Sequence, residues 1–298
     1  MSYFEILGNK YHPGHLQELL AVERGIKPAM RFSISEAQKP LLEMLKKESQ
    51  KSGMFFIVKN YGEIHKFGSR KNADYLIYAA KSERLAKKLY QYEKAGDIRK
   101  VGESLGYPEC CVDFYIDFLH SLPVKDGSCI KTFINTKSKP HFHANNIFNF
   151  QSRASGSFEK VKMLNSLNAS KSYSRYFLIS HIPCSYDCSE SVAIGRELLK
   201  VIKAELPNFA DEIVSALNRP FLLFDDFNWI AFNGAAKNKS TIEYEGIFPV
   251  RSLYPDDAFK NGNKVVVQKD EIQILTNDEI TCRIKKKDEH DGVIIDFT

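Results

Sequence analysis

Beyond Pro220 the chain is broken into short runs of strand-forming residues, and this pattern restricts the fold more than any other feature of the sequence. The runs are rich in β-branched and aromatic side chains and are separated by Gly, Asn and Asp: LLF, WIAFN, TIEYEGIFPV, KVVVQ, EIQIL, ITCRI and VIIDF. Such runs between turn-forming residues are typical of short β-strands. The sequence therefore predicts a β-rich C-terminal part, either a separate small barrel or the completion of a sheet begun earlier in the chain.

Local signals predict two helices in the first half of the chain. Ser82 can cap a helix from Glu83 to Ala95, because its hydroxyl can accept from a first-turn N–H, and Gly96 can end that helix. Asp97 can cap a further short helix that stops near Gly106. Each expectation depends only on residues within a few positions of the helix end.

The residues before Pro220 show mainly helical periodicity, with strand-like runs at 54–59 (MFFIVK) and 75–79 (YLIYA). We therefore predict an α+β fold with a mainly helical N-terminal and middle region, a few strands, and a β-rich C-terminal part. The expected organisation is an α+β domain over residues 1–210, which carries the cysteine site, and a β-rich domain or subdomain over residues 211–298.

Composition indicates an ordinary globular chain with a small excess of positive charge. The 298 residues are 43% hydrophobic and 27% charged, and 42 basic residues against 37 acidic ones give a net charge of +5. This excess is typical of a solvated surface, but it is also compatible with an anionic substrate or RNA. It leaves the oligomeric state open.

The sequence predicts a cytoplasmic protein without a membrane segment. The N-terminal residues lack the charged and apolar regions of a secretory signal, and no apolar run reaches the roughly 18 residues that span a bilayer. Thiols remain reduced in the cytoplasm, so the six cysteines are expected to be ligands, nucleophiles or core residues.

Four of the six cysteines lie in two similarly built segments, GYPECC (106–111) and HIPCSYDC (181–188). In each segment a proline precedes a helix-like run, and Ser185 or Asp187 can cap the second helix. Thiols near the positive end of a helix dipole favour the thiolate, which is the form that binds metal. If both pairs form one site, their sulfurs are expected to lie about 4 to 7 Å apart, the span of one ion or small cluster.

The spacing of these cysteines leaves three interpretations open. They can share a metal ion or cluster, act as catalytic thiols without metal, or simply belong to the core, where cysteine is common. The paired C-x2-C spacing of zinc fingers and the ferredoxin pattern are absent. A polar setting around the second pair favours the shared site, with an iron–sulfur cluster as the expected cofactor and zinc as the alternative.

Other polar side chains complete the candidate site. Cys110, Cys184 and Cys188 are the expected core ligands, and Cys111 or His181 is the fourth ligand or a proton donor. His181 and Asp187 are the candidate catalytic groups. H-x-H pairs and amide-rich loops suit the recognition of polar ligands. The candidate substrate-binding residues are His141, His143, Asn146 and Arg153.

The two motifs together resemble an uncharacterised prokaryotic family that carries a GYPxCC segment and a later HxPCSxxC segment. The resemblance covers roughly residues 97–199. It implies a shared role for Cys110, Cys111, His181, Cys184 and Cys188, and it implies no substrate.

Two functions from different classes follow from these residues. The first is an enzyme that uses the cysteine-ligated cluster or metal for sulfur chemistry or modification of a small molecule, peptide or RNA. The alternative is a non-catalytic RNA- or protein-binding protein with a structural zinc. Phosphate-loop, dinucleotide-binding and nucleophile-elbow motifs are absent from the sequence, which disfavours nucleotide hydrolysis, Rossmann redox chemistry and serine hydrolysis.

Overall fold

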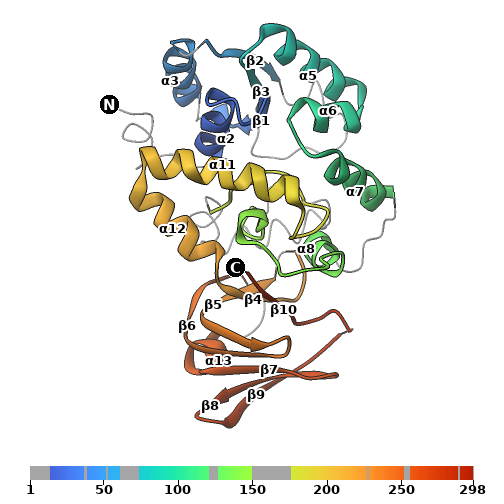
Figure 1. The fold of residues 1–298 in the computed structure, drawn as a ribbon, viewed down its shortest axis with the longest axis vertical. Coiled ribbons are helices and arrows are strands. Elements are labelled where there is room, and N and C mark those ends of the chain that lie inside the picture. The colour runs from blue at the N-terminus through green and yellow to red at the C-terminus, as the bar shows by residue number, and fades with distance from the viewer. Residues whose placement is uncertain are drawn as a thin grey trace. The chain divides into compact units, whose positions relative to one another are not determined.

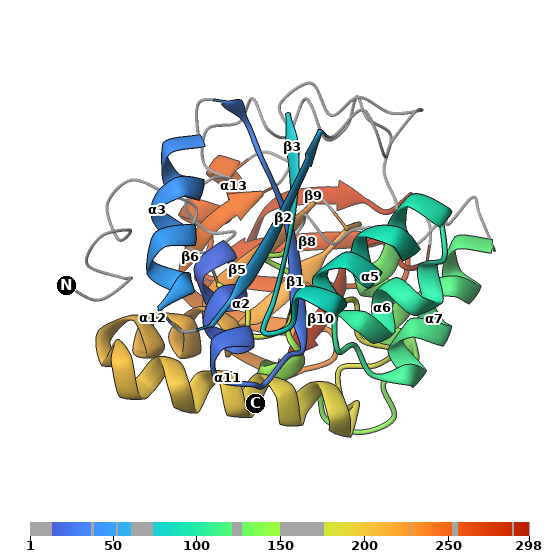
Figure 2. The same ribbon diagram turned by 90° about the horizontal axis from the view of Figure 1, so that it is seen from above.

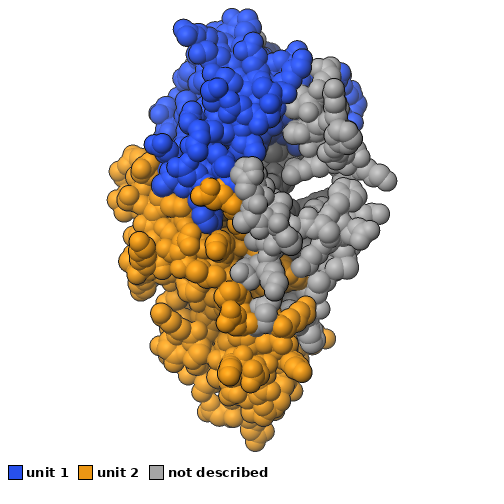
Figure 3. Space-filling model, turned by 90° about the vertical axis from the view of Figure 1, so that its right-hand side faces the viewer, with its two compact units in different colours: residues 1–116 blue, residues 117–298 orange. Residues whose placement is uncertain are grey.

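The fold is described from a computed structural model of the chain (Figure 1). It describes residues 14–36, 39–51, 53–60, 74–120, 127–149, 176–226, 228–251, 256–287 and 289–297. The chain divides into two compact units, residues 1–116 and 117–298 (Figure 3), and the division falls inside helix α7 (Glu109–His120). The predicted domain boundary at 210/211 stays a prediction; these two residues lie inside helix α12 (Pro207–Leu217).

The first unit is built on an antiparallel sheet in the order β1-β3-β2. Its strands are β1 (Ala29–Ile34), β2 (Phe55–Asn60) and β3 (Tyr75–Ala80). Figure 2 shows these strands between helices: α2 (Gly14–Glu23) and α3 (Lys39–Gln50), and then α5 (Glu83–Ala95) and α6 (Ile98–Ser104).

Both faces of this sheet are buried under helices. On one face Ile77 and Ala79 of β3 pack with Leu19 of α2 and Leu42 of α3. On the other face, alternate residues of the same strand form a second core with α5 and α6, whose buried members are Ala29, Leu76, Tyr78, Ala80, Ala86, Leu89 and Leu105. The alternation of side chains along a strand is what sends neighbouring residues into two cores.

The predicted fold class is therefore wrong for the N-terminal region, which is not mainly helical but a sheet between two layers of helices. Strand β1 was missing from the sequence-based prediction, although Met30, Phe32 and Ile34 alternate with Arg31 and Ser33 in the pattern of a strand with one buried face. Arg31 forms an ion pair with Glu93 of α5, so its polar side chain has a partner that is distant in the sequence.

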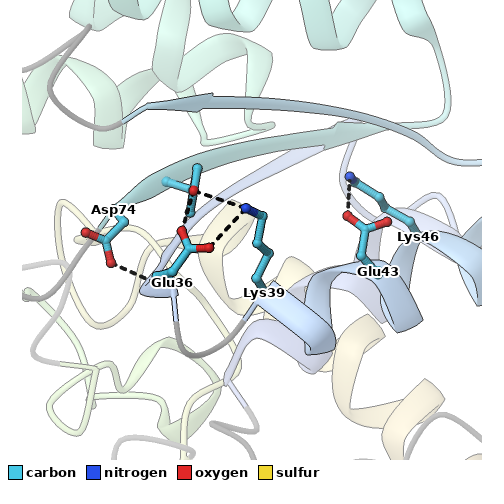
Figure 4. A network of polar contacts seen from close by, with 6 residues as sticks. Glu36, Lys39, Glu43, Lys46 and Asp74 are labelled. Atoms are coloured by element: carbon cyan, nitrogen blue, oxygen red, sulfur yellow. Dashed lines mark hydrogen bonds and ion pairs between the residues drawn. The ribbon is translucent and has the colours of Figure 1, made fainter.

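A polar network closes one end of the same sheet (Figure 4). Glu36 pairs with Lys39 at 3.0 Å and accepts a hydrogen bond from the hydroxyl of Tyr75, while the Glu36 N–H donates to Asp74 at 2.7 Å. The hydrogen bond from Tyr75 is the main cause that lowers the pKa of Glu36. On α3 itself, Lys46 pairs with Glu43, one turn apart. The network connects the end of β1, the start of α3 and the start of β3.

The second unit contains an antiparallel sheet in the order β10-β4-β5-β6-β7-β8-β9. Its strands are β4 (Pro220–Leu223), β5 (Trp229–Asn238), β6 (Thr241–Arg251), β7 (Lys264–Val267), β8 (Glu271–Thr276), β9 (Glu279–Lys285) and β10 (Val293–Asp296). The predicted β-rich C-terminal part is present, and its strands pair in one sheet separate from β1–β3.

This larger sheet curls around its own core. A Cβ on Gly292, which directly precedes β10, would lie 2.4 Å from Cδ1 of Ile272 on β8, although β10 and β8 are distant in the strand order. Register shifts along the β5–β6 pair supply the bends that allow this curvature. The enclosed side chains include Phe232, Tyr244 and Phe259, the last from helix α13 (Asp256–Asn261).

Helices and an aromatic cluster complete the second unit. Helices α11 (Ser189–Glu205) and α12 lie side by side in Figure 1, and both contact the short 3-10 helix η2 (Phe142–Ala144). Phe148 lies at the centre of the aromatic cluster, edge-on to Tyr176, Phe221, Trp229 and Phe248. Within the described residues, none of the helices is both long and apolar enough to cross a membrane.

Candidate metal centre

The first cysteine pair is held by the turn between α6 and α7. Gly106 adopts a left-handed conformation with φ of 73°, and a Cβ there would lie 2.4 Å from Cδ of Pro28. The next N–H, of Tyr107, donates to the carbonyl of Gly102 at 3.0 Å and closes the end of α6. The glycine of the GYPECC motif is thus required by both conformation and space.

Helix α7 begins immediately after Pro108, as the motif predicts. The Pro108 carbonyl accepts from the N–H groups of Cys111 and Val112, both at 2.9 Å, so both cysteines lie in the first turn. Val112 is in turn so close to α6 that a Cβ on Gly102 would lie 2.7 Å from its Cγ2. Cys110 is exposed and Cys111 is 2% exposed, which is the divergence expected of adjacent residues on a helix.

The second cysteine pair lies in a turn that helix α8 (Gly127–Ile134) and the residues after it brace. The Thr132 hydroxyl donates to the Pro183 carbonyl at 2.9 Å, and the Asn135 amide donates to the Cys184 carbonyl at 3.2 Å. The N–H of Tyr186 donates to the Thr136 hydroxyl at 2.9 Å. The side chains of Thr132, Asn135 and Thr136 therefore fix the backbone of the PCSYDC turn.

Helix α8 is itself anchored by a buried carboxylate. Asp226, which is 1% exposed, accepts from the N–H and hydroxyl of Ser128 and from the N–H of Cys129, each at 2.7 Å. A carboxylate at the N-terminus of a helix satisfies orphan donors and complements the helix dipole. The turn carrying Cys184 is thereby connected through α8 to the end of β4.

Asp187 stabilises the same turn from the other side, and it does not cap α11. Its carboxylate accepts from the N–H of Lys137 at 3.1 Å and from the N–H and hydroxyl of Ser138 at 2.8 and 2.9 Å. Burial alone would raise the pKa of Asp187, but hydrogen bonds from Ser185, Ser138 and Lys137 outweigh burial and hold the pKa below its ordinary value. The prediction that Ser185 or Asp187 caps this helix is wrong, because Cys188 occupies the N-cap position.

His181 is buried and engaged in hydrogen bonds within the motif. Its ring Nε2 lies 2.8 Å from the Ser191 hydroxyl in the first turn of α11, and its carbonyl accepts from the Asn146 amide at 2.9 Å. The residue is 5% exposed. These contacts join the start of the second motif to α11 and to the loop after η2.

The four motif cysteines form one cluster. The sulfur atoms of Cys110, Cys111, Cys184 and Cys188 all lie within 4.8 Å of one another, and those of Cys110 and Cys111 are 3.9 Å apart. The predicted convergence of the two pairs is confirmed, and such a group of thiols can bind a metal ion. His181 is not a member of this group.

The candidate substrate-binding residues fall in different surroundings. His141 directly precedes η2 and His143 lies within it, with ring centroids 5.6 Å apart. The His141 N–H donates to the Tyr186 carbonyl at 2.9 Å. The Asn146 amide donates to the carbonyl of His181. Arg153 lies outside the described residues. Catalysis by His181 and Asp187, and substrate binding by these four residues, stay predictions.

Residues that the sequence did not single out hold the second motif in place: Thr132, Asn135, Thr136, Ser138 and Asp226. Their signal in the sequence is weak, because a hydroxyl or amide in a loop is common and its partner is tens of residues away. Thr136 and Ser138 lie in a polar stretch, residues 136–140, whose composition is typical of a loop.

No protein-family model, curated protein or solved structure matches this chain. The resemblance to the prokaryotic family with GYPxCC and HxPCSxxC segments stays a prediction.

Proposed function

We propose that this chain is a metal-binding protein whose four clustered cysteines coordinate a single ion, and that the ion is zinc. The observation that carries the proposal is the spacing of the sulfurs. A tetrahedron with zinc–sulfur bonds of about 2.3 Å has sulfur–sulfur edges of about 3.8 Å. The Cys110–Cys111 separation is 3.9 Å and no separation in the group exceeds 4.8 Å.

The same spacing argues against the iron–sulfur cluster that the sequence favoured. In a four-iron cluster each thiolate binds a different iron, so the cysteine sulfurs lie farther apart than the edge of one tetrahedron. A compact set of four thiolates suits one tetrahedral ion, and zinc is the usual occupant of such a set. This argument supports the non-catalytic alternative over the cluster enzyme.

The role that we propose for the ion is structural. Four protein thiolates complete a tetrahedron, whereas catalytic zinc keeps one position open for water or substrate. His181 and Asp187 contribute hydrogen bonds to Ser191 and to residues 137–138, which suits positioning of the motif. In this proposal the ion holds the GYPECC segment against the HIPCSYDC segment. The substrate, RNA binding and cytoplasmic location stay predictions.

One observation favours a second candidate, a catalytic metal site. Cys110 is the exposed member of the group. An exposed thiolate is the ligand that an incoming substrate would displace most easily, which would open the fourth position. In that case the protein would be an enzyme acting through the metal rather than through the thiols.

Metal analysis after anaerobic purification separates these proposals. The expected result is a colourless protein with one zinc per chain and no acid-labile sulfide. Cys188→Ser should lose the ion, whereas Cys282→Ser, a change in strand β9, should retain it. A brown protein with iron and sulfide would contradict the single-ion proposal, and retention of metal by Cys188→Ser would contradict the ligand assignment.

Cobalt substitution tests whether the site is closed. Cobalt(II) in a tetrahedral thiolate site absorbs strongly in the visible range. If four cysteines remain bound, the spectrum should not change when small anions or thiols are added. A wild-type spectrum that shifts with added ligand towards the spectrum of Cys110→Ala with the same ligand bound, a variant in which the fourth position is already open, would support the catalytic candidate instead.

A further inference from the structure

The pair of histidines around η2 contains buried polar atoms that the fold leaves unsatisfied. The Nδ1 atoms of both His141 and His143 are buried and have no hydrogen-bond partner among the residues that the structure describes. His143 is 9% exposed, and its ring stacks on Phe142 with centroids 3.9 Å apart. A buried nitrogen without a partner costs free energy unless a water or ligand supplies the missing hydrogen bond, so two such atoms in neighbouring rings indicate a bound species.

Helix α11 brings a cation to the same place. A Cβ on Gly195 would lie 2.3 Å from the carbonyl oxygen of His143, so this helix passes directly against η2. The next residue, Arg196, is exposed and forms no ion pair with the described part of the chain. A guanidinium carries five N–H donors in a planar arrangement that suits an oxyanion.

The charges at this place favour an anion over a metal ion. The pKa of His143 is lowered to about 4, mainly by burial and also by the charges of His141 and Arg196. Near neutral pH the His143 ring is uncharged and can donate through one nitrogen, while Arg196 supplies positive charge. A cation bound there would be repelled by the guanidinium, whereas an oxyanion would satisfy both ring donors and the guanidinium.

We propose that His141, His143 and Arg196 form a binding site for a small oxyanion, of which inorganic phosphate is the simplest example. The site does not depend on the proposed metal ion, because none of the three residues belongs to the cysteine cluster. The hydrogen bond from the His141 N–H to the Tyr186 carbonyl connects it to the turn between Cys184 and Cys188. An anionic group held there would lie on the segment that carries the second cysteine pair.

The test is a titration of the full-length, metal-loaded protein with inorganic phosphate, followed by the NMR signals of the histidine rings. Saturable shifts of the His141 and His143 signals are expected, and chloride at matched ionic strength should not cause them. Bound phosphate should also raise the pKa of His143, since a nearby negative charge favours the protonated ring. A buried water in place of an anion would produce neither effect.

Three variants decide whether phosphate binds at this place. Arg196→Gln changes only an exposed side chain, and it should weaken phosphate about 10-fold, as expected for the loss of one charge-assisted hydrogen bond. His143→Phe should abolish binding; if this variant does not fold, His141→Gln serves in its place. His290→Gln, in the loop before β10, should bind like the wild type. Absence of saturable binding, or equal affinity in wild type and Arg196→Gln, would overturn the proposal.

Discussion

His181 shows how a single residue of the cysteine motifs can serve the fold. Its ring lies 2.8 Å from the Ser191 hydroxyl, and Ser191 is fully buried. A hydrogen bond between two buried groups contributes little net stability, but removal of one partner leaves the other unsatisfied. The hydrogen bond between His181 and Ser191 therefore joins the HIPCSYDC turn to α11.

Ser191→Ala should lower the free energy of unfolding by about 1–3 kcal/mol, because it leaves the ring nitrogen of His181 without this partner. Urea unfolding of the metal-loaded protein measures the loss. Ser189→Ala, an exposed change in the same helical turn, serves as the control and should cost less than about 0.5 kcal/mol. Equal losses in the two variants would show that the hydrogen bond between His181 and Ser191 does not contribute to stability.

The lowered pKa of Asp187 predicts how the stability of the protein changes with pH. Its pKa is lowered in the folded protein, so the carboxylate contributes stability above the unfolded pKa of roughly 4, and this contribution is lost as pH falls through the folded value. Asp187→Asn should therefore be less stable at pH 7 by about 1 kcal/mol and should lose less stability on acidification. Denaturant midpoints measured from pH 7 to pH 3 check this, with Asp211→Asn as an exposed control. Parallel pH profiles of wild type and Asp187→Asn would contradict it.

At the scale of elements, helix α11 is positioned by a close approach to η2. Gly195 has no room for a side chain, because the obstacle is the backbone carbonyl of His143 and not a flexible side chain. The approach sets α11, which carries Arg196, against η2, which carries His143. A packing requirement at one glycine thus determines the surroundings of two candidate sites.

Gly195→Ala should destabilise the protein by about 1–3 kcal/mol, as overpacking usually does. It should also weaken phosphate binding, since η2 must move away from α11. Gly246→Ala on β6 is the matched control, because nothing lies within 4 Å of a Cβ there. Thermal and urea unfolding of both variants measure the difference, and a Gly195→Ala variant as stable as Gly246→Ala would show that the helix and η2 separate without cost.

At the scale of the whole molecule, four cysteines from two distant segments would make binding of the proposed ion a part of folding. An ion that binds only the folded chain stabilises it by linkage, by about 4 kcal/mol when its concentration is 1000-fold above Kd. The same ion requires deprotonated cysteines, so its affinity falls as the solution becomes acidic.

Removal of metal by a chelator should therefore lower the melting temperature of the wild-type protein, and added zinc should restore it. Cys184→Ser should melt at the lower temperature with or without the chelator, because a ligand is already missing. Cys282→Ser should respond like the wild type. A wild-type melting temperature that is insensitive to the chelator, in protein shown to have lost its metal, would argue that the cluster does not support the fold.

The amino-acid sequence by itself determined the features that depend on neighbouring residues. Ser82 accepts from the N–H of Leu85 and Gly96 ends α5 in a left-handed conformation, both as expected from local capping rules. The short β-branched runs after Pro220 became strands, and the two cysteine motifs identified the four thiols that converge. These signals are local because backbone conformation responds mainly to residues within a turn or two.

Tertiary structure alone decided which partners the polar residues found. Arg31 of β1 pairs with Glu93 of α5, and Thr132 and Asn135 of a separate segment fix the second motif. The short spacing of the sulfurs likewise required the folded chain. A hydroxyl, amide or thiol can satisfy many partners equally well, so its own sequence context does not specify which one the packing of helices and strands will supply.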